Sequence, residues 1–519
     1  MAGGFAAVAW LSLTPVGAAT ADGSSSAVEH VFFRGNTVVS TDVLQSSAAP
    51  WLGRTLSADE LEELREALTH AYTDRGYVNS GVVIDADAPA EPGTLHFRVI
   101  EGRIQTVRIR GLERLRPGYV IERVRREAKE VLNVNVLRER FQRLLDDPLF
   151  ARINSRLLPG DQLGEATLDM DVVRARPYAL SVALNNYRPP SIGEKAYQVA
   201  GLVRNLSGWG DVLDVEITGA LNGSGGVDYS AGWLIPFTPF LTQASFRSSY
   251  ADSVVTEEPL KSLDIDSRIV RQEFDLVQPL WLSARGQIGM TAGVAYERNW
   301  TSIADLPFSF LPGASAGVTR ALTARLSPDF SFRSQRQYLG VRMTWLQANL
   351  LGAPSGPAAF DQPDHHYWVS TAQLHHILEI EHPRLELETR MTVQWTGAHI
   401  SDLHTIEVGG IESVRGFREN ELLLSNVRNL NIDLHWLAAQ ASGPRPAVTL
   451  GPFFDWASGH DVGQPTATLS STGAAVKLRW THVQADVAVG WHLIHPDFVD
   501  QQHGSWQDHG IHAQLLASL

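Results

Sequence analysis

Apolar and polar side chains alternate with a period of two along much of the second half of the chain. In residues 385–395 (LELETRMTVQW) one face is almost wholly apolar and the other is charged or polar, and residues 429–436 (NLNIDLHW) repeat this alternation. A period of two is that of a β-strand. A soluble sheet can show it too, but runs of about ten residues with aromatic ends are typical of strands that face lipid outside and water inside. The pattern therefore predicts membrane-spanning strands.

A polar, glycine-rich stretch, residues 409–420 (GGIESVRGFREN), lies between these two predicted strands. Because it breaks the alternation, it predicts a loop between barrel strands. Arg415 stands in the middle of the loop, where its charge needs either a partner or water. The loop is therefore the first candidate functional segment.

The first part of the chain follows a different pattern. In residues 27–102 a strand-like segment (28–33) precedes a helix and two further strands. Ser57, with Glu60 three residues later, forms the capping box that begins the helix, and Gly76 ends it. This order predicts a small α+β module.

The same order occurs again in residues 103–176. After a first strand, helical periodicity predicts helices over 117–128 and 134–145. Closing strands are expected at 151–157 and 166–172. Two copies of one small module thus precede the barrel.

The remaining residues, 177–519, show only alternating segments separated by Gly, Pro, Asn and Ser. At about 20 residues for each strand and connection they make about 16 strands, an even number as in bacterial outer-membrane barrels. Short links at 443–446 and near Thr481 alternate with links expected to be long, at 458–471 and 495–507. The predicted fold class is membrane all-β: a 16-stranded antiparallel transmembrane β-barrel preceded by two α+β modules.

Composition narrows the class further. The chain has 519 residues, 44% hydrophobic content and 14 Trp, yet no apolar run of about 20 residues that would span a bilayer as a helix. This excludes a helical membrane protein. The net charge of -14 argues against a nucleic-acid partner, which favours a basic face. Zero cysteines exclude disulfides, zinc-thiolate sites and thiol nucleophiles.

The N-terminus predicts export. Residues 5–19 are apolar and lead into a small-residue cleavage pattern at 19–21 (ATA), so residues 1–21 are expected to be a signal peptide and 22–26 a linker. The segment lacks the usual basic residues at its start, which is consistent with a truncated or misassigned N-terminus. The alternative is a disordered apolar tail.

Several short motifs resemble those of a known family, the outer-membrane transporters of two-partner secretion (haemolysin secretion/activation type). The motifs are AYTDRGYVNS at 71–80, LLPG at 157–160 with Gly164 and Leu168, NLSGWGDVL at 205–213, VRGF at 414–417 and FFDWA at 453–457. The resemblance covers residues 27–519. It implies two periplasmic polypeptide-transport-associated (POTRA) modules, 27–102 and 103–176, and a barrel, 177–519, in the outer membrane of a Gram-negative bacterium.

The resemblance also implies that the motif with Val414, Arg415, Gly416 and Phe417 tips a long loop that folds back into the barrel lumen. By alternation, Phe453 and Asp455 share the lumen face of their strand.

Arg415 could then make a bidentate bond to Asp455, with Gly416 turning the loop beside the wall and Phe417 packing on Phe453. Alternatively, both charges are solvated and their pair contributes about 0–1 kcal/mol. Ala457 replaces the glycine that usually ends the second motif, which puts any close backbone approach there in doubt.

Three weaker signals favour ordinary structural interpretations. Residues 313–317 (GASAG) match the nucleophile elbow of serine hydrolases, but no strand and helix flank them, so a small-residue loop is favoured. The adjacent histidines in 364–366 (DHH) and 375–376 (HH) point to opposite faces of a strand and cannot readily share a metal ion. The basic segment 123–129 fits an anionic lipid surface or a solvated helix face equally well.

The expected function is a conduit without enzymatic activity or cofactor. By the resemblance, the POTRA modules capture an unfolded exoprotein of haemolysin or adhesin type, partly by adding a strand to a sheet edge, and the barrel passes it outward. The expected partners are this exoprotein and outer-membrane lipid, and a monomer is expected. The alternatives are an assembly factor that inserts other barrels, a hydrolase that uses Ser315, and a passive porin.

Overall fold

The computed structural model describes residues 26–125, 130–223, 225–238, 241–283, 285–308, 316–352, 363–381, 384–496 and 504–519. The predicted signal peptide and linker residues 22–25 lie outside these ranges. The chain forms two compact units, Met1–Arg176 and Pro177–Leu519.

The first module is a three-stranded sheet with helices packed against it. Its elements are β1 (His30–Arg34), α1 (Thr41–Ala48), the 3-10 turn η1 (Ala49–Trp51), α2 (Ala58–Thr73), β2 (Gly81–Ile84) and β3 (Thr94–Ile100). Strand β3 is central, parallel to β1 and antiparallel to β2. The predicted capping box begins α2, because Ser57 and Glu60 each accept from the backbone N–H of the other. Helix α1 was not predicted, since it is only eight residues long and buries only Leu44 and Ala48.

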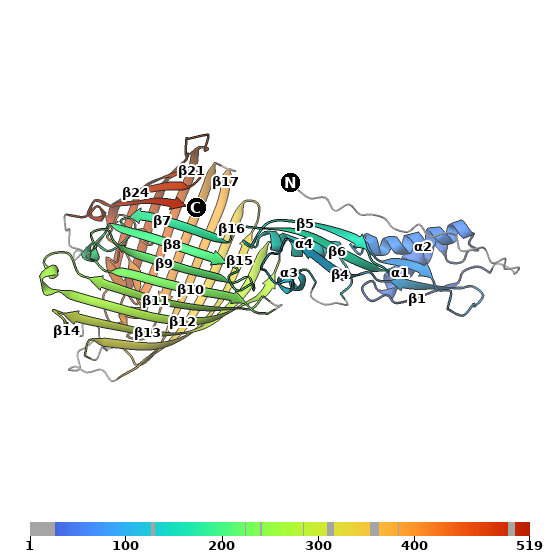
Figure 1. Cartoon of the computed structure of the whole chain (residues 1–519), viewed down its shortest axis with the longest axis horizontal. Helices are drawn as coiled ribbons and strands as arrows, with labels where there is room; N and C mark the ends of the chain where they lie inside the picture. Colours follow the sequence, from blue (N-terminus) through green and yellow to red (C-terminus); the bar gives the residue numbers. More distant parts are fainter. Residues whose placement is uncertain are drawn as a thin grey trace. The chain divides into compact units, whose positions relative to one another are not determined.

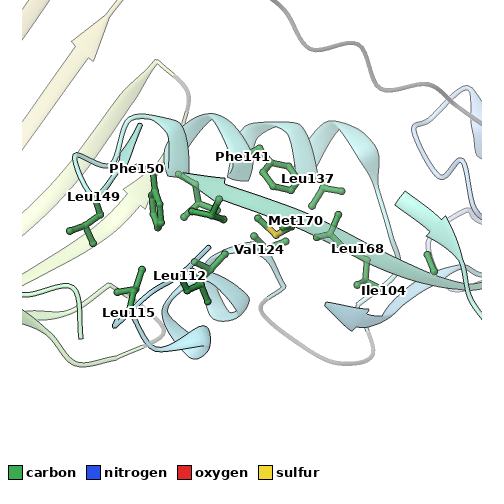
Figure 2. Close-up of a cluster of buried hydrophobic side chains, with 14 of the residues drawn as sticks. Ile104, Leu112, Leu115, Val124, Leu137, Phe141, Leu149, Phe150, Leu168 and Met170 are labelled. Carbon is green, nitrogen blue, oxygen red and sulfur yellow. The ribbon is translucent and has the colours of Figure 1, made fainter. Parts of the chain in front are cut away.

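The second module repeats this plan with β4 (Arg103–Arg110), α3 (Pro117–Val124), α4 (Val134–Leu145), β5 (Phe150–Pro159) and β6 (Glu165–Arg174). Strand β6 is central, parallel to β4 and antiparallel to β5. Figure 2 shows Leu137 and Phe141 of α4 above Leu168 and Met170 of β6, within one buried apolar core. Helix α4 has its predicted bounds. Helix α3 ends before the predicted residue 128, because Arg125 is already extended.

Sixteen strands of the described residues close into an antiparallel barrel (Figure 1), which confirms the predicted fold class. They are β7 (Tyr178–Asn185), β8 (Ala196–Arg204), β9 (Val212–Ala220), β10 (Val227–Pro236), β11 (Gln243–Val254), β12 (Ile265–Leu282), β13 (Gly286–Ile303), β15 (Val318–Arg333), β16 (Gln337–Leu350), β17 (His366–Glu381), β18 (Leu385–Trp395), β21 (Asn426–Ala439), β22 (Ala447–His460), β23 (Ala467–Arg479), β24 (Val483–Ile494) and β25 (Ile511–Ser518). The last strand, β25, pairs with β7, and a two-residue strand, β14 (Leu306–Pro307), pairs with the end of β13. None of the helices in the described ranges is long and apolar enough to cross a bilayer.

The two faces of the wall differ as the alternation predicts. In β22, Phe454 is exposed on the outer face, while Phe453, Asp455 and Ala457 are buried on the inner face. Other large apolar side chains are also exposed on the outer face, for example Leu180, Trp233, Phe246, Phe274 and Trp345. An apolar outer face and a polar inner face are what a barrel in lipid requires.

One predicted connection is wrong in length. The link expected to be long at 458–471 spans only 461–466, because Gly459 pairs with Ala467 and the ladder continues past the polar residues. The turn near Thr481 is tight, as predicted, between Arg479 and Val483. The strand ladder, not the polarity of the sequence, therefore sets where this loop begins.

Candidate functional site inside the barrel

The candidate site lies in the connection 396–425 between β18 and β21, named here the inner loop. It contains the 3-10 turn η4 (Asp402–His404) and a hairpin of β19 (Ile406–Val408) and β20 (Leu422–Leu424). The hairpin presents the polar tip, residues 409–421. Glycines with positive φ, at +108° and +92°, make the turn from β19 into the tip at Gly409 and Gly410.

Arg415 is held against the inner wall by two carboxylates. Its Nε and Nη2 donate to the two oxygens of Asp455 on β22, at 2.7 and 2.8 Å, and its Nη1 donates to Asp433 Oδ1 on β21 at 2.6 Å. Its backbone N–H also donates to Asp455, at 3.0 Å. The guanidinium thus uses the bidentate geometry that only arginine offers. All three side chains are buried, so the alternative of two solvated charges is wrong.

The aromatic partners differ from the expected ones. The ring of Phe453 lies under Arg415, with the guanidinium carbon 3.7 Å from the ring centroid, an arrangement favoured by the negative face of the ring. Phe417 instead stacks on His492 of β24, with ring centroids 4.0 Å apart, and joins an apolar cluster that includes Val414 and Ala457. The methyl group of Ala457 thus fits under the tip.

Glycines let the tip lie directly on the wall. Gly416 has φ +98°, and a Cβ on Gly490 of β24 would come within 2.8 Å of both the Gly416 Cα and the Arg415 carbonyl oxygen. His492 Nε2 lies 2.6 Å from the Gly416 carbonyl oxygen, and Ser471 of β23 donates to that of Arg415. Backbone and side chains of the tip are therefore both fixed by β21 to β24.

A second arginine of the tip, Arg418, binds the outer connections of the barrel. It donates to both oxygens of Glu257, in the β11–β12 connection, at 3.0 Å each, and to Asp508, in the β24–β25 connection, at 2.9 Å. The backbone N–H of Glu419 donates to Gln507 at 2.8 Å. The tip is thus joined to two loops at the rim of the barrel.

The base of the inner loop is anchored on other strands. His404 of η4 lies with Nδ1 2.6 Å from the hydroxyl of Tyr367 on β17 and with Nε2 3.0 Å from Glu297 on β13. Gln394 at the end of β18 donates to the His404 carbonyl oxygen at 2.9 Å. Because β13 is eight strands from β24, which contacts the tip, in the order of sixteen, the inner loop extends across the lumen.

Several of these residues were not identified from the sequence. Asp433 lay on the predicted polar face of 429–436, so a second carboxylate for Arg415 could have been read from that alternation. Nothing local marked Gly490, His492 or His404, whose roles depend on strand order. Ser315 of the hydrolase alternative lies outside the described residues, as do residues 126–129 of the basic segment.

Two α+β modules before a sixteen-stranded barrel with an arginine loop folded inside define a class: outer-membrane transport barrels with POTRA modules. Residues 26–102 match the model of the POTRA domain, ShlB-type, and residues 164–479 match that of the haemolysin secretion/activation protein ShlB/FhaC/HecB. Since the second match covers more than half of the chain, the chain belongs to this family of two-partner secretion transporters. Its barrel lies in the outer membrane of a Gram-negative bacterium and its POTRA modules in the periplasm.

Individual relatives are distant. The outer membrane transporter CdiB of Escherichia coli O6:K15:H31 is 22% identical over 535 residues, which cover 94% of this chain and 83% of the relative. The heme/hemopexin transporter protein HuxB of Haemophilus influenzae (strain Rd) is 23% identical over 186 residues, 36% of this chain and 33% of the relative.

Two solved structures are similar in fold. CdiB from Escherichia coli superposes with a TM-score of 0.73 at 19% identity, over 98% of this chain and 93% of that one. BamA from Haemophilus ducreyi lacking POTRA domains 1–3 gives 0.55 at 11% identity, over 96% and 100%. At these identities the likeness concerns the fold alone.

Proposed function

We propose that this protein secretes an unfolded exoprotein of haemolysin or adhesin type through its barrel, and that the inner loop closes the lumen until transport begins. The observation that carries the proposal is the attachment of one loop to opposite parts of the wall. His404 at its base lies against β13 and β17, and its tip lies against β24, where His492 contacts the Gly416 carbonyl oxygen; β13 and β24 are eight strands apart in the order of sixteen. An inner loop that crosses the lumen must move before an exoprotein can pass.

The resting position is held by a few concentrated contacts, which suits a device that releases as a unit. The two carboxylates that bind Arg415, those of Asp433 and Asp455, stand on the neighbouring strands β21 and β22. These strands pair continuously there, with Asp433 opposite Phe453 and Asn431 opposite Asp455. Beside the tip, between Glu412 and the wall strands β16 to β18, lies a cavity of about 460 Å³. This space gives the tip somewhere to move inside the lumen.

Strand β5 is the proposed capture edge of the POTRA modules. It is ten residues long and pairs with β6 on one side only, within the described residues. The other edge of the same sheet, β4, is partly covered, because Arg125 donates to the carbonyl oxygens of Ile104 and Gln105. An extended exoprotein segment could therefore add as a fourth strand beside β5.

Conductance of the purified full chain in a planar bilayer tests the closing role of the inner loop. Arg415→Ala is expected to raise the open fraction and to expose the tip to protease. Arg428→Ala, an exposed arginine on β21, is the matched control and is expected to conduct like the parent. Unchanged conductance and unchanged protease protection in Arg415→Ala would refute the proposed closing role.

Single cysteines test the capture edge, since the chain has no cysteine of its own. Ser155→Cys on β5 is expected to form a disulfide with a cysteine-scanned secretion segment of a candidate exoprotein of haemolysin or adhesin type. Glu63→Cys on the exposed face of α2 serves as the control. Equal cross-linking at both positions would remove β5 as the capture site.

Barrel assembly is the second candidate, favoured by the seam of the barrel. Strands β25 and β7 share only five paired positions, Gln514 to Ser518 with Asn185 to Ser181, so the wall is weakly joined there.

A disulfide between cysteines at Ser181 and Ser518 would lock this seam. Secretion through the lumen is expected to survive the lock, as it should survive a matched disulfide at the paired Ser230 and Ser249. Loss of function only with the seam lock would support the assembly alternative.

A further inference from the structure

A cluster of two carboxylates and two imidazoles lies on the inner wall, away from the Arg415 site. Glu386 and Glu388 stand on β18, His375 on β17 and His435 on β21, with His435 directly opposite Glu386. The ligand atoms of Glu386, Glu388 and His435 all lie within 4.8 Å of one another. The sequence pattern could not show this, because adjacent His375 and His376 face opposite sides and the relevant partners come from neighbouring strands.

The spacing suits direct coordination of a metal ion. His435 Nε2 lies 3.1 Å from Glu388 Oε2. Two ligand atoms bound to one tetrahedral Zn²⁺ at about 2.0–2.1 Å are about 3.3 Å apart. A cation could thus replace the hydrogen-bonding proton between these groups with little movement of either strand.

The second oxygen of Glu388 is already oriented. His375 Nε2 lies 2.9 Å from Glu388 Oε1, as an outer-shell group does when it positions a ligating carboxylate. Arg390 Nε lies 3.8 Å from the same oxygen, within ion-pair but not hydrogen-bonding distance, so it balances the charge of Glu388 without orienting it. His375 is therefore a positioning residue for Glu388.

The charge balance of the cluster favours a cation. Glu386 has no ion-pair partner among the described residues, although it stands beside a second carboxylate. Two neighbouring carboxylates repel each other, and a divalent ion between them would remove that repulsion while using the free lone pairs. All four side chains are at least partly exposed to the lumen, so an ion can reach them.

We propose that Glu386, Glu388 and His435 form a binding site for a divalent transition-metal ion of the Zn²⁺ type, with Glu388 positioned by His375. The site joins β18 to β21, the two strands that carry the inner loop, at their ends remote from that loop. A bound ion would fasten this strand pair where it meets the periplasmic turns.

Cobalt is a suitable probe, because Co²⁺ in a four- or five-coordinate site gives visible absorption bands that Zn²⁺ displaces. CoCl₂ is titrated into the detergent-folded full chain without an affinity tag. The expected result is saturable binding of one Co²⁺ per chain. The absorption bands should disappear on addition of ZnCl₂ and should be absent in His435→Gln and Glu388→Gln.

Two further variants keep the test decisive if those two fold poorly. Glu386→Gln removes a ligand that has no other ion-pair partner in the described chain, so it should fold normally and lose the absorption bands. His375→Gln should weaken binding about 10–100-fold, the range typical for loss of an outer-shell partner.

His376→Gln is the matched control: the same substitution, one residue along β17, on the lipid-facing side. It is expected to bind Co²⁺ like the parent chain. No saturable binding in the parent, or binding that Glu386→Gln leaves intact, would overturn the proposal.

Discussion

Two arginines three residues apart, Arg415 and Arg418, are each held by two carboxylates, yet they do different work. The partners of Arg415 stand on barrel strands, and the side chains of Arg415 and Asp455 are 6% and 0% exposed. The partners of Arg418 lie in connections at the rim, and the side chains of Arg418 and Glu257 are 15% and 28% exposed. The same kind of arginine–carboxylate pairing therefore has two roles. At Arg415 it fixes the inner loop to the barrel wall, and at Arg418 it joins two outer connections to the tip of that loop.

Two features explain why the ion pairs of Arg415 are expected to stabilise the barrel more than those of Arg418: their burial, and the strands that carry the carboxylates. A charge that loses its partner inside the wall cannot regain water, whereas Glu257 at the rim can turn towards solvent and Asp508 keeps backbone N–H donors from Gly504 and Ser505. The strands that carry Asp433 and Asp455 are paired on both sides, so these carboxylates cannot follow a displaced loop. Removal of Arg415 should therefore cost far more than removal of Arg418.

The largest effect is expected for Arg415→Ala. It leaves two carboxylates buried without their counter-ion, a loss of about 3–5 kcal/mol for a broken buried pair. Urea unfolding of the detergent-folded barrel, followed by tryptophan fluorescence, measures it. A loss no larger than that of Arg418→Ala would contradict the comparison.

The two carboxylates that bind Arg415, those of Asp455 and Asp433, should not contribute equally to the stability of the barrel. Asp455 accepts two bonds from the guanidinium, one from the Arg415 backbone and one from Asn431, while Asp433 accepts a single bond from Arg415. Asp455→Asn should therefore destabilise the barrel by about 3 kcal/mol, and Asp433→Asn by about 1.5–2 kcal/mol. The same urea series compares them, and the reverse order would show that β21, not β22, holds the tip.

Gly490→Ala tests the close contact of the tip with the wall without touching any charge. The added Cβ would lie 2.8 Å from the Arg415 carbonyl oxygen and from the Gly416 Cα, so the tip must move, at a cost of about 1–3 kcal/mol. Gly397→Ala is the matched control within the inner loop, because nothing lies within 4 Å of its added Cβ. Protease digestion should cut the tip faster in Gly490→Ala only. Equal rates in both variants would mean that the tip does not depend on this contact.

The entry of the loop into the lumen, and with it the approach of Arg415 to Asp455, was predicted from the family resemblance. Alternation of side chains was enough to predict the barrel and the lumen face of β22. It could not predict which distant strands meet the loop, because strand order and shear decide this. Phe417 shows the limit: its partner His492 stands on β24, two strands beyond Phe453 in the barrel order. The predictions missed helix α1 and made the 461–466 link too long for a local reason, because short elements carry little periodic signal.

The smallest effect is expected for Arg418→Ala. Glu257 is 28% exposed and can turn to water, and Asp508, although only 4% exposed, keeps the backbone N–H groups of Gly504 and Ser505 as donors, so the barrel should lose only about 1–2 kcal/mol. The rim connections that contain Glu257 and Asp508 should become more accessible to protease, while the conductance stays at the parent level because Arg415 still holds the tip. If Arg418→Ala opened the pore as Arg415→Ala is expected to do, the rim contacts would be part of the closing device and the division between the two arginines would fail.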